Sequence, residues 1–164
     1  MIKAACPGTY DPVTNGHIDI FRRAAALFDE LVICVTENRS KNCLFTPEKR
    51  AELLNRVLKD IPNVSVDIAG GLIAEYAKNN GISVIVKGLR NADDFESEYR
   101  MSIYNRRLEP GVETIYLPAD ENHIFLSSSA VRELAYFGSD ISEYVPEEII
   151  NDITDAMKDK RRGC

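Results

Sequence analysis

Short apolar runs alternate along this chain with amphipathic segments. The runs cover residues 2–6, 31–36, 64–68, 82–86 and 113–117, and they have the length and composition of buried strands. Between them, apolar residues recur at helical spacing, as Ile18, Phe21 and Ala25 do after the first run. This alternation predicts an α/β fold with a doubly wound (Rossmann-like) five-stranded parallel sheet and helices on both faces. We expect one domain over residues 1–164.

Polar residues, prolines and glycines indicate where the helices begin and end. Thr14 is a plausible N-cap, which places His17 in the first turn of the first helix. Thr46-Pro47-Glu48 has the sequence of another helix start, and Asn80-Gly81 is typical of a helix end. Pro146 begins the last helix, which we expect to extend to about residue 160 and to pack on or beside the domain.

Composition narrows the class of protein. The formal charge of −6 and the pI near 5.0 argue against binding to bulk nucleic acid or to an anionic membrane. No apolar run has the length of a membrane helix, and the start of the chain does not resemble a signal peptide. The four cysteines have no paired spacing, and with two histidines and no CxxC pattern a zinc site is not expected. We therefore expect a cytoplasmic protein with reduced thiols.

Clusters of polar residues follow four of the predicted strands or begin the next helix. They are Thr9 to His17, the loop with Lys41, the run Lys87 to Arg90, and the serines at 127–129. The carboxyl ends of parallel strands meet at one edge of the sheet, and ligands bind there where the strand order reverses. The sequence therefore predicts that these clusters converge on one binding site.

The side chains in these clusters suit the binding of phosphate. Thr9 offers a hydroxyl group, and Lys41, Lys87, Arg90 and Arg132 offer positive charge. His17 and the serines stand at helix starts, where free N–H groups attract anions. The helix dipole also favours a neutral His17 that donates a hydrogen bond. There is no Walker motif, no GxGxxG and no evident Ser-His-Asp set, which leaves phosphoryl or nucleotidyl transfer without an enzyme nucleophile.

Two of these segments resemble the signature motifs of the nucleotidylyltransferase superfamily. Thr14-Asn15-Gly16-His17 is similar to its (H/T)xGH motif, and Leu126 to Arg132 is similar to its (I/L)SSSxxR motif. Within that superfamily the chain resembles the phosphopantetheine adenylyltransferases over nearly its whole length. The segments that carry this likeness, in order, are Pro7 to His17, Ser40-Lys41, Lys87 to Arg90, Asp94 to Glu98 and Asn105-Arg106.

The resemblance implies the reversible transfer of AMP from Mg-ATP to 4′-phosphopantetheine, the penultimate step of coenzyme A synthesis. The products are dephospho-CoA and pyrophosphate, with no covalent enzyme intermediate. It implies catalytic roles for His17 and Lys41, and acceptor contacts from Thr9, Lys41, Leu72, Ile73 and Lys87. It implies ATP contacts from Thr9, Tyr10, His17, Gly88, Leu89, Arg90, Glu98, His123, Ile124, Phe125, Leu126, Ser127, Ser128 and Ser129. Mg²⁺ is expected to be carried by ATP, since no carboxylate cluster for it is evident, and the family implies a homo-oligomer, a hexamer.

Two positions depart from the family pattern, and some charges have a simpler interpretation. Lys87 stands where the family commonly has arginine, and His123 stands where it often has tryptophan or tyrosine. We interpret Asp93, Asp94 and Glu96 as solvated charge with no role in the site.

Two other functions remain open. A sister nucleotidylyltransferase would use the same core on nicotinamide mononucleotide or glycerol phosphate. A regulator would bind nucleotide without catalysis. The Pro7-to-Pro12 run and the Ser40-Lys41 loop favour phosphopantetheine, and the presence of both His17 and Lys41 argues against a regulator.

Overall fold

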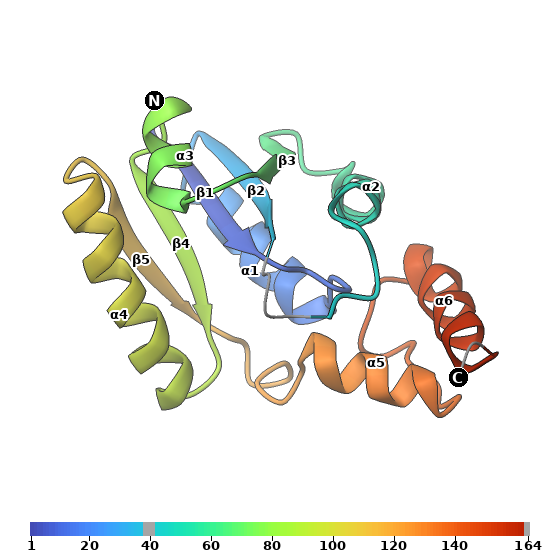
Figure 1. The fold of residues 1–164 in the computed structure, drawn as a ribbon. Coiled ribbons are helices and arrows are strands. Elements are labelled where there is room, and N and C mark those ends of the chain that lie inside the picture. The colour runs from blue at the N-terminus through green and yellow to red at the C-terminus, as the bar shows by residue number, and fades with distance from the viewer. Residues whose placement is uncertain (38–41, 163–164) are drawn as a thin grey trace.

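The computed structural model describes residues 1–37 and 42–162. Its strands are β1 (Lys3–Gly8), β2 (Glu30–Thr36), β3 (Val64–Ala69), β4 (Val84–Leu89) and β5 (Glu113–Pro118). All neighbouring strands pair in parallel, and the 5-stranded sheet has the order β3-β2-β1-β4-β5 (Figure 1). The predicted doubly wound parallel sheet is therefore confirmed.

Helices connect the strands as the apolar spacing predicts. They are α1 (Asn15–Ala25), α2 (Pro47–Leu58), α3 (Ile73–Asn79), α4 (Ala92–Leu108), α5 (Ser128–Tyr136), the 3-10 turn η1 (Glu147–Ile149) and α6 (Ile150–Arg162). The caps at Thr14 and Thr46 are confirmed, since each side chain accepts a hydrogen bond from the N–H three residues on. None of the described helices is long and apolar enough to cross a membrane.

β1 and β4 extend beyond the predicted runs, to Gly8 and Leu89, and two elements begin later than predicted. The fourth strand begins at Val84 rather than Ile82, because the Ile82 N–H donates to the carbonyl of Ala77 at the end of α3 and so belongs to the preceding turn. The last helical segment starts as the turn η1, and regular α-helix begins only at Ile150.

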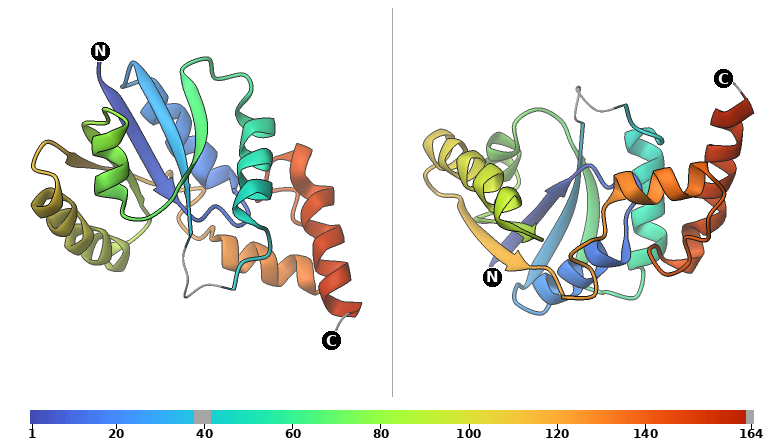
Figure 2. Two further views of the ribbon diagram at one scale, coloured as in Figure 1. Left: turned by 45° about the horizontal axis from the view of Figure 1, so that its top comes forward. Right: turned by 90° about the horizontal axis from the view of Figure 1, so that it is seen from below.

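Alternation along the strands divides the core into two layers. Leu31, Ile33 and Val35 of β2 pack in one cluster with buried residues of α1, α2, α5 and α6. Val32 and Cys34 point to the opposite face, where they join a smaller cluster with residues of α3. Figure 2 shows the sheet between α1 on one side and α3 with α4 on the other.

The strand order of the sheet reverses between β1 and β4. These strands pair only at Ala4 with Val84 and Ala5 with Ile85, whereas β1 and β2 stay paired from Lys3 to Gly8. β1 and β4 therefore separate toward their carboxyl ends. This is the crevice in which open α/β sheets bind their ligands.

Candidate active site

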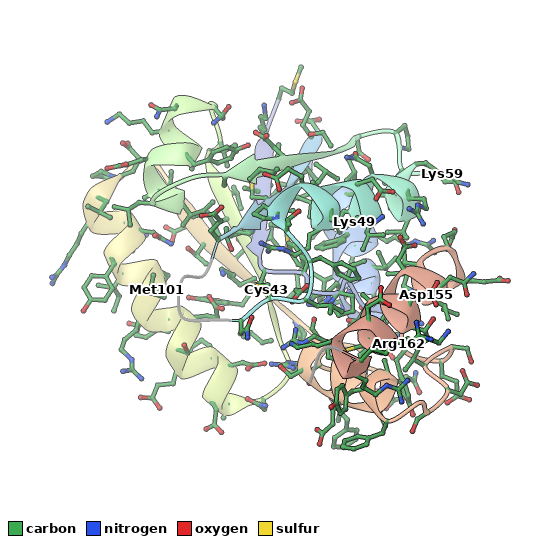
Figure 3. All side chains as sticks on the ribbon, turned by 45° about the vertical axis from the view of Figure 1, so that its right-hand side comes forward. Cys43, Lys49, Lys59, Met101, Asp155 and Arg162 are labelled. Carbon is green, nitrogen blue, oxygen red and sulfur yellow. The ribbon has the colours of Figure 1, made fainter. Side chains whose placement is uncertain are left out.

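A cavity of about 510 Å³ occupies this crevice. Its walls come from the β1–α1 loop, β4, α4 and the start of α5, and also from the segment before α2. Figure 3 labels two residues of these walls that the sequence did not single out, Met101 on α4 and Cys43 ahead of α2. The clusters at 9–17, 87–90 and 127–129 therefore converge on one cavity, as the sequence predicts.

Most of the site residues expected from the sequence line this cavity. They are Thr9, Tyr10, His17, Ile73, Lys87, Gly88, Arg90, Glu98, His123, Leu126, Ser127, Ser128 and Ser129. Four expected contact residues are not among its walls: Leu72, Leu89, Ile124 and Phe125. Phe125 is 89% exposed and Leu72 is 51% exposed, so a ligand contact at either stays a prediction. Lys41 lies outside the described residues.

The start of α1 fixes the orientation of His17. The backbone N–H of Thr14 donates to Nδ1 at 3.0 Å, and the Thr14 hydroxyl lies 2.9 Å from the same atom. Thr14 and His17 thus cap the helix reciprocally. Because Nδ1 accepts from a backbone donor, the neutral ring carries its proton on Nε2. His17 therefore caps its helix and keeps one N–H donor for the cavity that it lines.

The surroundings of His17 favour this neutral form. Burial lowers the pKa of the imidazole from 6.5 to about 4, and the Arg90 guanidinium acts in the same direction. The direction agrees with the sequence-based hypothesis, but the first cause is desolvation rather than the helix dipole. At neutral pH His17 is a hydrogen-bond donor without charge.

This pKa predicts how stability depends on pH. Between pH 6.5 and about 4 the unfolded histidine is protonated while the folded one is not, so protons favour unfolding. The contribution of His17 to the free energy of unfolding is complete above pH 6.5 and is lost as the pH falls toward 4. Chemical denaturation at pH 7.5 and 5.0 should show a larger loss for the wild type than for His17→Gln. Equal losses would contradict the assignment.

Tyr10 packs against His17 in the wall of the cavity. Its ring meets the imidazole edge-on, with centroids 5.1 Å apart, and its hydroxyl donates to the Cys6 carbonyl at 2.8 Å. Tyr10 is 6% exposed and has a positive φ of 51°, which folds the ring back over Gly8. Its side chain supports the histidine, and the expected contact with ATP stays a prediction.

Gly8→Ala should therefore disturb the site through Tyr10. A Cβ at Gly8 would lie 2.5 Å from the Tyr10 ring, so the ring must shift, and its edge-on contact with His17 would change. We expect a loss of roughly 1–3 kcal/mol in unfolding free energy, typical of overpacking, together with a lower kcat. Gly70→Ala is the matched control, because a Cβ there meets nothing within 4 Å. Calorimetry and steady-state kinetics on both variants would check this, and a Gly8→Ala enzyme with normal kcat would contradict it.

Arg90 is held in place by Asp94, which corrects the interpretation of that residue as solvated charge. The Asp94 carboxylate accepts from Arg90 Nε at 2.9 Å and from Nη2 at 3.1 Å, a two-pronged pair across one turn at the start of α4. Arg90 Nη1 also donates to the carbonyl of Leu126 at 3.3 Å, ahead of α5. Glu96, in contrast, is exposed and pairs with Arg100 on the surface.

Lys87 of β4 and Glu98 of α4 form an ion pair in the wall of the cavity. The Lys87 ammonium lies 3.0 Å from the Glu98 carboxylate, and each side chain is mostly buried. The sequence-based roles assign Lys87 to the acceptor and Glu98 to the nucleotide. The structure thus joins the two expected subsites by one ion pair.

The serine run begins α5 and its hydroxyls already have partners within the chain. Ser127 caps the helix through the Ala130 N–H, and Ser128 donates to the Pro12 carbonyl at 2.7 Å. Ser129 accepts from Arg132 at 3.4 Å. The first N–H groups of a helix have no partner within it, so the backbone here remains available to an anion.

His123 packs against Gly16, in the first turn of α1. A Cβ placed on Gly16 would lie 3.3 Å from the His123 Cβ, so the glycine allows this close approach. The His123 Nδ1 is buried without a hydrogen-bond partner among the described residues, and the nearest acid, Asp120, is 4.0 Å away. A bound ligand is one way to satisfy this atom.

Sequence reasoning missed the residues that hold the loops together. Asp11 and Arg50 are 1% and 2% exposed and bond to segments distant in sequence. No local signal set Asp11 apart, because an acid in a turn rich in proline and glycine is explained by the turn alone. Asn105 of α4 is also buried on the cavity wall.

The fold and the site define the general class of this protein. A family model described as cytidylyltransferase-like matches residues 5–134. A bifunctional NMN adenylyltransferase/ADP ribose pyrophosphatase from Francisella tularensis superposes with a TM-score of 0.71 at 16% identity, over 96% of this chain and 50% of that one. The structure of that bifunctional enzyme with AMP and a manganese ion gives a TM-score of 0.68 at 17% identity, over 96% of this chain and 51% of that one. The chain thus has the fold of a nucleotidyltransferase.

Sequence relatives identify the particular family. The phosphopantetheine adenylyltransferase of Clostridium kluyveri is 46% identical over 164 residues, which is all of both chains. That of Symbiobacterium thermophilum is 52% identical, over 89% of this chain and 90% of its own. This chain belongs to the phosphopantetheine adenylyltransferase family.

Proposed function

We propose that this chain transfers AMP from ATP to the 4′-phosphate of 4′-phosphopantetheine, reversibly, to give dephospho-CoA and pyrophosphate. The observation that carries the proposal is the His17 Nε2 donor in a cavity that also holds Lys87, Arg90 and the start of α5. Full-length relationship to enzymes of that name supports the choice of acceptor.

The reaction needs positioning and charge stabilisation rather than an enzyme nucleophile. An oxygen of the acceptor phosphate attacks the α-phosphorus of ATP, a new P–O–P bridge forms, and the bond to the departing pyrophosphate breaks. His17 donates from Nε2 to an α-phosphate oxygen as its charge grows, and Lys41 and Lys87 hold the acceptor phosphate. Arg90 and the N–H groups at the start of α5 hold the β- and γ-phosphates.

The acids on the cavity wall indicate how Mg²⁺ would be held. Asp94 and Glu98 are both paired with cations, and no group of three potential metal ligands occurs among the described residues. We therefore propose that Mg²⁺ binds through the ATP phosphates and water, which suits its preference for few protein carboxylates. It would neutralise phosphate charge there.

We also propose that the protein is a homo-oligomer, a hexamer by family resemblance. The exposed apolar residues of α4 support association, because Phe95 and Tyr99 on one side of this helix and Tyr104 and Leu108 on the other are 46–56% exposed. Large apolar side chains that stay exposed in this number on one helix mark a contact between proteins. Light scattering of the purified protein would measure the mass, and a monomer at working concentration would reject the proposal.

A pyrophosphate-release assay tests the reaction. Purified protein is mixed with Mg-ATP and 4′-phosphopantetheine, with nicotinamide mononucleotide and glycerol 3-phosphate in parallel wells. We expect release only with phosphopantetheine. Release with another acceptor would reassign the substrate, and silence in every well with ATP still bound would favour a regulator.

A further inference from the structure

The carboxylate of Asp11 bonds to two segments that flank the cavity from different sides. Its oxygens accept from the backbone N–H groups of Leu44 at 2.6 Å and of Phe45 at 3.0 Å, ahead of α2. Arg132 of α5 donates to the Asp11 carbonyl and lies 3.3 Å from its Oδ2. One side chain thus connects the β1–α1 loop, the segment before α2 and the helix that begins with the serine run.

Arg50, a residue of α2, donates hydrogen bonds to three backbone carbonyls in the same region. Its Nη1 donates to the carbonyls of Thr9 at 2.5 Å and Thr36 at 3.1 Å, and its Nε donates to the carbonyl of Phe45 at 3.2 Å. Thr36 ends β2, and Phe45 precedes α2. The chain is therefore fixed on both sides of residues 38–41, which include Lys41.

Burial of the Asp11 carboxylate costs free energy, and these bonds compensate for that cost. Asp11 is 1% exposed, and a buried carboxylate is tolerated only when hydrogen bonds and a cation compensate for lost water. Its oxygens accept from two backbone N–H groups and Oδ2 also faces Arg132, so the carboxylate is already engaged by protein groups. The arrangement serves geometry rather than chemistry.

We propose that Asp11 is a positioning residue that sets the acceptor-side segment at residues 44–45 against the nucleotide-side helix α5. In-line attack requires the two phosphates at a fixed separation. Lys41, proposed for the acceptor, precedes residues 44–45 in the chain, and the N–H groups proposed for the nucleotide begin α5. The inference rests on the proposed adenylyl transfer. The inference adds to the proposed function the residue that couples the acceptor-side segment to the nucleotide-side helix.

Asp11→Asn tests this role. The asparagine amide keeps the size of the side chain but places an NH₂ group against donors that need an acceptor. We expect kcat to fall by about 10- to 100-fold, the effect of a small misplacement of reactants, while KM for each substrate changes by less than about 3-fold. A merely structural role would lower the melting temperature without this split between kcat and KM.

Asp152→Asn is the matched control. Asp152 is a largely buried acid that bonds Lys49 at 2.8 Å and Arg56 at 2.7 Å, between α6 and α2, and it does not line the cavity. We expect Asp152→Asn to lower the melting temperature and to leave kcat unchanged. If Asp11→Asn behaves in the same way, the proposal is rejected.

Arg132→Lys provides a second variant should Asp11→Asn fold poorly. A lysine keeps the charge but replaces the guanidinium, whose Nη1 contacts the Asp11 carbonyl and Oδ2, with a more strongly hydrated ammonium on a different stem. We expect a lower kcat for Arg132→Lys alone and no further loss when it is added to Asp11→Asn, because both act through one contact. Additive losses, or a normal kcat for Arg132→Lys, would overturn the coupling. A wild type that releases no pyrophosphate would reject the proposed function and this inference with it, whereas an active wild type with an unaffected Asp11→Asn rejects the inference alone.

Discussion

His17→Ala should lower kcat by about 100- to 1,000-fold, the usual effect of removing one donor to a developing oxyanion. The dissociation constant for ATP should change far less, because the groups proposed to hold the outer phosphates, Arg90 and the start of α5, are untouched. The expectation follows from the cap, in which Thr14 occupies Nδ1 and leaves Nε2 as the donor. Such a group acts mainly in the transition state, where charge grows on the α-phosphate.

His17→Asn is the informative companion variant. Its amide can imitate one histidine nitrogen at a time, and with a shorter side chain it is expected to reproduce the cap contact rather than the distant Nε2 donor. Stability should therefore be retained better than in His17→Ala, while kcat stays low. The measurement is single-turnover kinetics beside calorimetric titration of ATP. Parallel losses of ATP affinity and turnover in His17→Ala would show that the ring contributes ground-state binding instead.

Much of the fold could be predicted from the sequence because helix caps, helix starts and strand alternation depend on neighbouring residues. The cap at Thr14, the start at Thr46-Pro47 and the alternation in β2 each depend on residues within a few positions. The convergence of polar clusters needed one further rule, that parallel strands align their carboxyl ends. Together these were enough to place Thr9, His17, Lys87, Arg90 and the serines around one cavity.

What the sequence could not predict depends on pairings between distant residues. Asp11 bonds to Leu44 and Phe45, which are 33 and 34 positions away in the sequence, and it contacts Arg132, which is 121 positions away. Its burial is therefore not visible in any local window. Asp94 was misjudged for a different reason: an acid in the first turn of α4 is explained by the helix dipole alone, so its two-pronged bond to Arg90 gave no separate signal.

The pairing of Lys87 with Glu98 leads to the second large expected effect. Lys87→Ala should raise KM for the acceptor by about 10- to 100-fold, because a bond to a charged group is worth roughly 1.5–3 kcal/mol. The variant also leaves the Glu98 carboxylate without its partner 3.0 Å away, and that charge would repel an incoming phosphate. KM for ATP should rise much less, since Arg90 is anchored independently by Asp94.

Glu98→Gln separates these two contributions. If the acceptor phosphate competes with Glu98 for Lys87, Glu98→Gln alone should lower KM for the acceptor, and it should raise KM for ATP if Glu98 contacts the nucleotide. In the double variant the repulsive charge is gone as well, so KM for the acceptor should lie below that of Lys87→Ala. A coupling energy of about 0.5–3 kcal/mol between the two sites is then expected from the cycle. Strict additivity, or equal rises in KM for both substrates in Lys87→Ala, would mean that the ion pair supports the wall of the cavity rather than competing with the acceptor.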